Sequence, residues 1–239
     1  MTRIGEIERR TQNRILQIFQ DQLHYEYLGN WEDRIGNSNI EEEYLRKFLR
    51  KQVKSEDLIS KALFELYKAA GDQSKNLYDV NKEVYSLLRY GVKVSPGAGK
   101  NRQTVWLIDW EHPENNHFAI AEEVTINGLH DKRPDLVLYV NGIALGVIEL
   151  KRSTVSVSEG IRQNLDNQKQ LFIKAFFTTI QIVMAANETE GMRYGVIETP
   201  EKHFLTWKEP SEVVNLLDRQ IMQVCEKKRF LELIHDFIV

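Results

Sequence analysis

Three charged residues interrupt two apolar segments of the chain, and their types can carry chemistry. Asp135 stands near the start of the first segment, and Glu149 and Lys151 stand at the end of the second. A charge beside a sheet interior is costly unless it is paired or holds a metal. Two carboxylates can hold Mg²⁺ and leave positions for water and a phosphate oxygen, and a nearby lysine can orient that water or stabilise the phosphate. These residue types can therefore serve metal-assisted hydrolysis, for example of a phosphate ester.

The elements that must position these residues are two strands joined at Asn141-Gly142, which is a strong signal for a tight hairpin turn. Side chains alternate along a strand, so directly opposed residues share one face of the sheet. A regular hairpin with a two-residue loop would place Asp135 opposite the residue before Glu149, and the two carboxylates would point to opposite faces. The site therefore needs an offset of one residue. We expect a bulge, either in a three-residue loop at Gly142 or at an irregular strand start at Pro134.

The composition is that of an ordinary globular protein, with 239 residues, 42% hydrophobic and 28% charged. The single cysteine, Cys225, excludes a disulfide framework and a multi-cysteine zinc site. No apolar run reaches membrane-spanning length, and residues 1–6 lack the apolar core of a signal peptide, so we expect a cytoplasmic protein. A free-standing DNA-binding protein usually carries a basic surplus. The net charge of −3 therefore predicts that tight DNA binding would depend on a partner.

The pattern along the rest of the chain predicts an α/β fold built on a mixed β-sheet. Both faces of the central hairpin are apolar, so helices should cover each side of the sheet. Residues 1–76 are expected to form a helical lead-in that packs on this sheet. Helices are expected over residues 3–28, 40–51, 55–70, 77–90, 158–172 and 211–238, and further strands over 92–95, 104–110, 118–127, 181–186, 193–197 and 203–206.

Pro134-Asp135, a hairpin and Glu149-x-Lys151 together resemble the metal site of the PD-(D/E)xK nucleases. The alternative is that Glu149 and Lys151 are solvated residues at a strand end. Over most of residues 77–239, the chain resembles the N-terminal region of the restriction (R, or motor) subunit of type I restriction-modification enzymes. The segments that carry this resemblance are Asn81–Tyr85, Leu88–Gly91, Leu107–Trp110, Arg133–Lys151, Gly160–Asn164, Phe176–Thr179, Arg193–Gly195, Glu198–Lys202 and Lys228–Ile238.

The resemblance implies a restriction-endonuclease-like fold, with residues 77–210 as the nuclease core and 211–239 as a helical connector towards a helicase motor. It implies that Asp135, Glu149 and Lys151 are catalytic and that the two carboxylates hold Mg²⁺. The substrate would be double-stranded DNA, cut at non-specific sites after ATP-driven translocation, and the partners would be methyltransferase and specificity subunits. Nothing in the chain matches an ATP-binding loop, so ATP would serve only motor domains outside it.

Two further residues are candidates for supporting this site. Many relatives of the family carry Gln-x-x-x-Tyr on the helix after the hairpin; Gln163 matches the glutamine, but Asn167 stands where the tyrosine would be. Nucleases of this class often place an acidic residue on the helix before the sheet, and Glu83 is the candidate. An exposed helical glutamate is the plainer interpretation of Glu83.

Arg152, Arg162 and Lys169 add positive charge beside the acidic site, as contact with DNA phosphates would require, although a solvated helix face would look the same. Two other functions stay open. The chain could be an assembly or DNA-binding module in which the nuclease centre is incidental, or another PD-(D/E)xK enzyme such as a junction resolvase. Resolvases are usually shorter and more basic than this chain.

Overall fold

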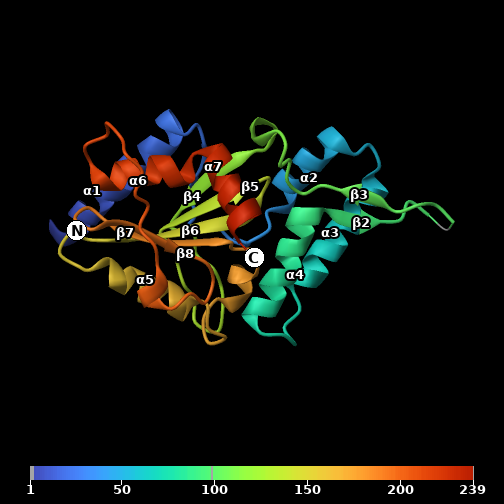
Figure 1. The fold of residues 1–239 in the computed structure, drawn as a ribbon. Helices are drawn as coiled ribbons and strands as arrows, with labels where there is room; N and C mark the ends of the chain where they lie inside the picture. Colours follow the sequence, from blue (N-terminus) through green and yellow to red (C-terminus); the bar gives the residue numbers. More distant parts are fainter. Residues whose placement is uncertain (1–2, 98, 239) are drawn as a thin grey trace.

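The centre of the computed structural model, which describes residues 3–97 and 99–238 with side chains from residue 9 onward, is a mixed β-sheet. Its six strands have the order β1-β4-β5-β6-β7-β8 within the described residues (Figure 1). β1 runs parallel to β4 and β6 runs parallel to β7, whereas the other neighbours are antiparallel. The strands are β1 (Glu26–Asn30), β4 (Phe118–Glu122), β5 (Leu136–Val140), β6 (Ile143–Lys151), β7 (Ile182–Asn187) and β8 (Gly191–Gly195).

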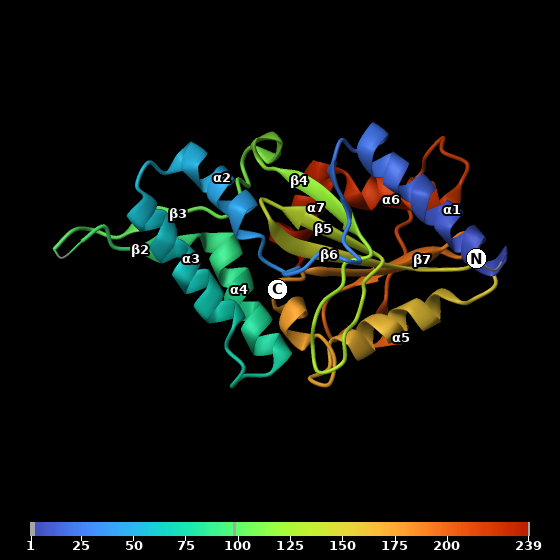
Figure 2. The ribbon, with the colours of Figure 1, turned by 180° about the vertical axis from the view of Figure 1, so that it is seen from behind.

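Helices cover both faces of this sheet, as Figures 1 and 2 show from opposite sides. One face packs against α1 (Arg3–Gln17), the π-helical turn η1 (Ile18–Gln22), α6 (Leu216–Cys225), α7 (Lys227–Glu232) and the π-helical turn η5 (Leu233–Phe237). The other face packs against α5 (Val157–Asn167) and the 3₁₀ turn η3 (Lys174–Thr178). The layered α/β architecture predicted from the sequence is confirmed.

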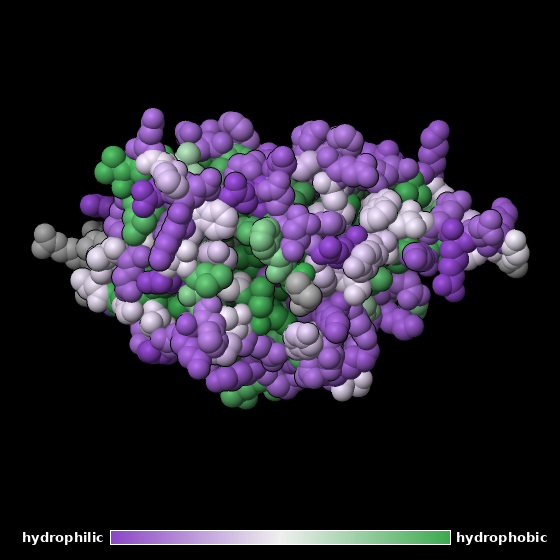
Figure 3. Space-filling view, viewed as in Figure 1, coloured by the Kyte–Doolittle hydropathy of each residue, from purple (hydrophilic) through white to green (hydrophobic). Residues whose placement is uncertain are grey.

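A helical lobe lies beside one end of the sheet (Figure 2). It consists of α2 (Glu42–Gln52), α3 (Glu56–Ala70) and α4 (Leu77–Tyr90), which pack together. A separate hairpin of β2 (Val92–Val94) and β3 (Gln103–Val105) projects from this lobe. Short 3₁₀ turns, η2 (Pro113–Asn115) and η4 (Glu201–His203), complete the chain. The surface seen in Figure 3 is mostly hydrophilic, with apolar side chains gathered near its middle.

The alternation of apolar residues in β5 explains why both faces of the sheet are buried. Leu136, Leu138 and Val140 belong to the core beneath α1, α6 and α7, whereas Val137 and Tyr139 belong to the core beneath α5. Each of these five side chains is 0% exposed. Such two-sided burial is typical of a central strand that is covered by helices on both faces. Among the described residues, the structure contains no helix long and apolar enough to cross a membrane.

The N-terminal segment differs from the single helix expected over residues 3–28. The helix ends after Gln22, and His24 adopts a left-handed backbone with φ of 55°. Residues 26–30 then form β1, which pairs with β4 at the sheet edge. Tyr25 turns inward and donates a hydrogen bond from its hydroxyl to the Cys225 carbonyl at 2.9 Å. The N-terminal region is therefore not only helical, because it also contributes a strand to the sheet.

Other element boundaries also differ from the sequence-based expectation. The helix expected over 211–238 is broken at Glu226, whose extended backbone separates α6 from α7 and whose side chain caps α7. The helix expected over 158–172 starts one residue earlier, is capped by Ser156, and stops at Asn167. Residues 106–110 lie outside β3, and the strand expected over 203–206 is reduced to a single bridge between Tyr194 and Leu205.

Candidate active site

A bulge in β6 sets the register of the site. The turn itself has two residues, Asn141 and Gly142, with positive φ of 52° and 82°. One extra residue, Leu145, then lies between two consecutive pairings of β6 with β5, namely Tyr139 with Ala144 and Leu138 with Gly146. The predicted bulge is confirmed, but it lies inside the strand rather than in the loop or at Pro134. A bulge inside the strand leaves the tight turn intact and supplies the one-residue offset further along.

This offset places Asp135 level with Glu149 on one face of the sheet. Leu136 pairs with Ile148, so the residues next to them, Asp135 and Glu149, are neighbours across the hairpin. The Leu150 amide donates a hydrogen bond to Asp135 Oδ2 at 2.6 Å and fixes this carboxylate. Both carboxyl groups lie on the face that α5 covers, because Val137 and Val147 of the same alternating sets belong to that core.

Lys151 and Gln163 complete a compact group around Glu149. Lys151 Nζ lies 3.0 Å from Glu149 Oε1 and donates to Gln163 Oε1 at 2.7 Å. Gln163 Nε2 in turn donates to Glu149 Oε1. Gly160, one turn earlier in α5, lets this helix pack closely on the sheet, because a Cβ there would lie 3.1 Å from the Cβ of Ala185 in β7. The glutamine therefore holds the lysine and the glutamate in a fixed arrangement.

The electrostatics of the group favour a bound cation. Glu149 is 1% exposed, and its Oε2 has no hydrogen-bond donor among the described residues. Burial raises the pKa of the Glu149 carboxyl well above its usual range, and the negative charge of Asp135 raises it further, while Lys151 acts in the opposite direction. When both carboxyl groups are ionised, their negative charge exceeds the positive charge of Lys151, and a divalent cation with oxygen ligands would neutralise that excess.

The donor set of the site consists of two carboxylates. Within the part of the chain that the structure describes, no group of three or more His, Cys, Asp or Glu residues is placed to hold a metal ion. Asp135 and Glu149 would therefore hold a hard cation such as Mg²⁺ together with water or substrate oxygens, which is the usual manner of Mg²⁺ binding in proteins.

Glu83 is not brought to this group by the structure. Its carboxylate bonds Lys75 Nζ at 2.5 Å on the exposed side of α4. The shallow pocket around it is lined by Lys75, Asp79, Lys82, Glu83 and Ser86, all from α4 or the turn before it. The plainer interpretation from the sequence, an exposed helical glutamate, describes this position.

Asn167 lies one helical turn beyond Gln163 and is 1% exposed. Its side-chain atoms have no hydrogen-bond partner among the described residues, whereas its carbonyl accepts a hydrogen bond from the Ile173 amide at 3.1 Å. The residue that stands in place of the family tyrosine is therefore buried at the end of α5, and its side chain forms no hydrogen bond with Gln163, Lys151 or Glu149.

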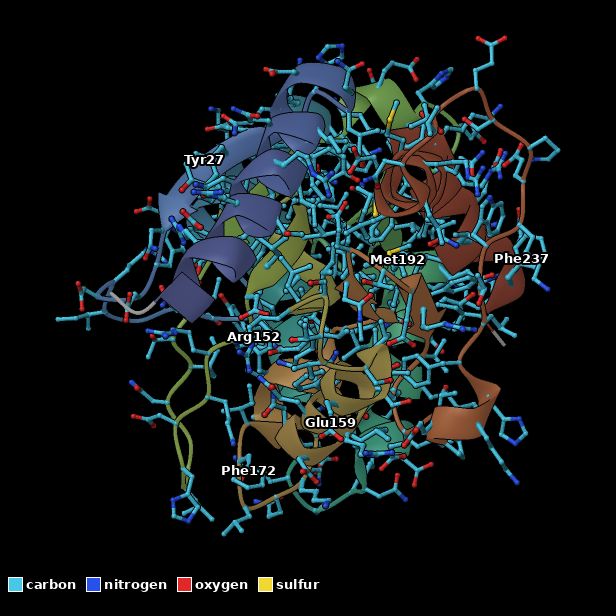
Figure 4. All side chains as sticks on the ribbon, turned by 90° about the vertical axis from the view of Figure 1, so that its left-hand side faces the viewer. Tyr27, Arg152, Glu159, Phe172, Met192 and Phe237 are labelled. Carbon is cyan, nitrogen blue, oxygen red and sulfur yellow. The ribbon has the colours of Figure 1, made fainter. Side chains whose placement is uncertain are left out.

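A cleft of about 510 Å³ opens beside Lys151, and it gathers two of the three basic candidates. Figure 4 shows Arg152 between α1 and α5, with Glu159 on α5 below it. Lys169 is absent from this lining and bonds Asp166 at 2.5 Å on the exposed side of α5. Lys132 was not among the basic candidates predicted from the sequence, although its position shortly before Pro134-Asp135 was a usable signal. The lining residues are Lys132, Lys151, Arg152, Val155, Glu159, Arg162, Gln163 and Asp166.

A second feature that the sequence analysis missed is the acidic pair Glu122-Glu123 at the end of β4. Glu122 is 3% exposed. Partial burial of Tyr27, together with the hydrogen bond from its hydroxyl to Glu122, raises the pKa of Tyr27 to about 12. Glu123 has a left-handed φ of 51°, and its amide donates to the Asp135 carbonyl at 2.8 Å. The pair therefore anchors the chain that leads into Asp135. The donors to Glu122 are Arg9 at 3.0 Å, Gln12 at 2.8 Å and Tyr27 at 2.5 Å.

A mixed sheet flanked by helices, with two carboxylates and a lysine at adjoining strand ends, defines a restriction-endonuclease-like fold. Residues 7–202 match the sequence profile of the family described as type I restriction enzyme R protein N terminus. The chain belongs to this family, as the resemblance seen in the sequence indicated.

Two curated relatives give the same picture. A putative type I restriction enzyme MjaIXP endonuclease subunit of Methanocaldococcus jannaschii is 25% identical over 186 residues, which cover 66% of this chain and 18% of the relative. The type I restriction enzyme HindI endonuclease subunit of Haemophilus influenzae is 27% identical over 137 residues, which cover 54% of this chain and 12% of the relative. The matches thus span less than a fifth of the length of either relative.

Proposed function

We propose that this chain is the DNA-cleaving domain of a type I restriction enzyme R protein, a type I site-specific deoxyribonuclease that hydrolyses phosphodiester bonds of double-stranded DNA. The observation that carries the proposal is the meeting of Asp135, Glu149 and Lys151 at adjoining strand ends, in a chain of this family. The basic cleft beside Lys151 supports a polyanionic substrate. The proposal places the chain in the PD-(D/E)xK class.

Each residue has a role that follows from its surroundings. Asp135 and Glu149 would hold Mg²⁺, which lowers the pKa of bound water and neutralises charge on the phosphate when it is present. Lys151, which lies 3.0 Å from Glu149 Oε1, would orient the attacking water or stabilise the phosphate under attack. Gln163 would act as a positioning residue, because it bonds both Lys151 and Glu149 and limits the freedom of each.

In the whole enzyme, we propose that DNA is delivered by ATP-driven translocation and cut at non-specific sites. Motor domains outside this chain would hydrolyse ATP, and methyltransferase and specificity subunits would select the DNA. The relatives named above are endonuclease subunits far longer than this chain, which leaves room for such domains. This chain would then supply the chemistry of strand scission and little of the sequence selection.

Parallel cleavage and ATPase assays on the assembled complex test the proposal. Asp135→Ala and Lys151→Ala in the intact R subunit should abolish DNA cleavage while ATP hydrolysis stays close to that of the wild type. Lys93→Ala is the matched control, because this exposed lysine of β2 lies outside the cleft and should leave both activities unchanged. Equal loss of ATPase and cleavage in Lys151→Ala, or full cleavage in Asp135→Ala, would contradict the proposal.

A further inference from the structure

The cationic side chains of the cleft differ in whether a carboxylate neutralises them. Lys151 is paired with Glu149, and Arg162 is held by two glutamates at 2.7 and 2.8 Å. Lys132 and Arg152 line the same cleft, and neither forms an ion pair within the described residues. Their positive charges are therefore the part of the cleft that an anion can use without first breaking an ion pair.

Lys132 is held in place by the loop that precedes Asp135. The residues at the two ends of this loop, Ile126 and Lys132, exchange backbone hydrogen bonds at 2.8 and 3.1 Å. The Lys132 ammonium lies 4.1 Å from the centre of the Phe172 ring, which lies on the segment after α5. The cation therefore has a defined position on an aromatic face instead of a free side chain in solvent.

The loop is also fixed against the segment after α5 through its backbone. The His130 amide donates to the Leu171 carbonyl at 3.1 Å. Gly128 packs so closely that a Cβ there would lie 2.2 Å from the Phe172 carbonyl oxygen, so only glycine fits this contact. Figure 4 shows Phe172 in the lower part of the view, on the segment after α5. Residues 126–132 thus form a loop that is packed against the segment after α5 and contributes Lys132 to the lining of the cleft.

We propose that Lys132 and Arg152 form a phosphate clamp for duplex DNA. Lys132 lies on the loop that leads into Asp135, and Arg152 directly follows Lys151 at the end of β6. This inference rests on the proposed nuclease function and adds which charges hold the backbone. Arg162 is excluded from the clamp by its two glutamate partners, and Lys169 is excluded by its place outside the cleft. Phosphate contacts of this kind set register on the duplex without reading its sequence.

Fluorescence anisotropy with a short labelled duplex and the purified 239-residue chain tests the clamp. The titrations are run in Ca²⁺ at several salt concentrations, with a gel to verify that the duplex stays intact. Lys132→Gln and Arg152→Gln should each weaken binding about two- to fivefold, as loss of an exposed charge contact does. Each should also reduce the slope of log K against log salt by about 0.9, the value of one phosphate contact. Lys93→Gln, which makes the same change of charge on exposed β2 away from the cleft, should alter neither quantity.

A second variant separates the position of Lys132 from its charge. Gly128→Ala leaves the net charge unchanged but pushes the loop from the Phe172 carbonyl, so it should reduce the salt slope as Lys132→Gln does. Lys132→Arg keeps the positive charge and should bind the duplex as the wild type does. Thermal melting verifies that each variant is folded. If wild-type binding depends on salt and Lys132→Gln and Arg152→Gln both match Lys93→Gln, the clamp is overturned while the nuclease proposal stands. Binding by the wild type that does not respond to salt would overturn both.

Discussion

At the scale of single residues, the site is built around a buried carboxyl group that is costly to ionise. Burial and the nearby Asp135 charge raise the pKa of Glu149, and Lys151 offsets only part of this effect. The folded pKa therefore lies above the unfolded pKa. The stability that comes from keeping Glu149 protonated is fully present below the unfolded pKa and is lost as pH rises through the folded pKa. A divalent cation would reverse the balance, because it favours the ionised pair.

Glu149→Gln should therefore stabilise the metal-free chain relative to the wild type, with a difference that grows as pH rises above the usual glutamate range. Mg²⁺ should raise the melting temperature of the wild type, increasingly so at higher pH, and should leave that of Glu149→Gln unchanged. Thermal unfolding in EDTA and in Mg²⁺ across a pH series measures both effects. A variant less stable than the wild type in EDTA at every pH would show that ionised Glu149 is stabilising without metal.

At the scale of elements, the central hairpin is fixed at both ends. Its bulge at Leu145 brings the carboxylates to one face, and its turn docks on the helical lobe. The Glu41 amide donates to the Gly142 carbonyl at 2.7 Å. A Cβ on Gly142 would lie 2.5 Å from the Glu41 carbonyl oxygen and 2.8 Å from Tyr44 Cβ. The turn thus needs glycine both for its positive φ and for its contact with the residues that begin α2.

Gly142→Ala should accordingly destabilise the chain more than Gly36→Ala. Both glycines have similar positive φ, 82° and 80°, but nothing lies within 4 Å of a Cβ at Gly36. Gly36→Ala should cost about 1–2 kcal/mol from backbone strain alone. Gly142→Ala should add about 1–3 kcal/mol from overpacking. Urea denaturation of the two variants gives this difference, and equal losses would mean that the turn is not docked as described.

At the scale of the whole molecule, a complete candidate site is combined with a net charge of −3. Lys132, Lys151, Arg152 and Arg162 line one cleft, and many other basic residues are paired with carboxylates, as Arg9, Arg34 and Arg50 are. Non-specific DNA affinity depends mainly on the number of phosphate contacts. Two cations without an ion pair among the described residues are few for this purpose, which fits the proposal that other domains and subunits deliver the DNA.

The isolated chain should therefore bind linear duplex weakly, with a Kd on the order of 10⁻⁴–10⁻⁶ M or weaker at physiological salt, and should cut it poorly. A gel-shift comparison of linear and four-way-junction DNA distinguishes this expectation from that of a self-sufficient junction resolvase. Comparable weak binding to both DNAs is expected. Tight and junction-selective binding by residues 1–239 would favour the resolvase instead.

The parts of this protein that depend on local chemistry could be predicted from the amino-acid sequence. Asn141-Gly142 specified a tight turn, the apolar strands specified a two-sided sheet, and the need to bring Asp135 and Glu149 together required a bulge. That the extra residue is Leu145 is seen only in the folded chain, because the position of a bulge depends on how both strands pack against their covering helices. Local patterns report which face a residue prefers, but they do not report which distant segment it meets.

The same reason accounts for what the sequence analysis missed or misplaced. Residues 26–30 became an edge strand through pairing with β4, about ninety positions away, which the periodicity of their own segment did not reveal. Glu83 had the right residue type on the right helix, yet the packing of α4 turned it to solvent beside Lys75. Lys132 joined the cleft because its loop docks beyond α5. Residue types determined what chemistry this chain can do, and long-range packing decided which of those residues meet.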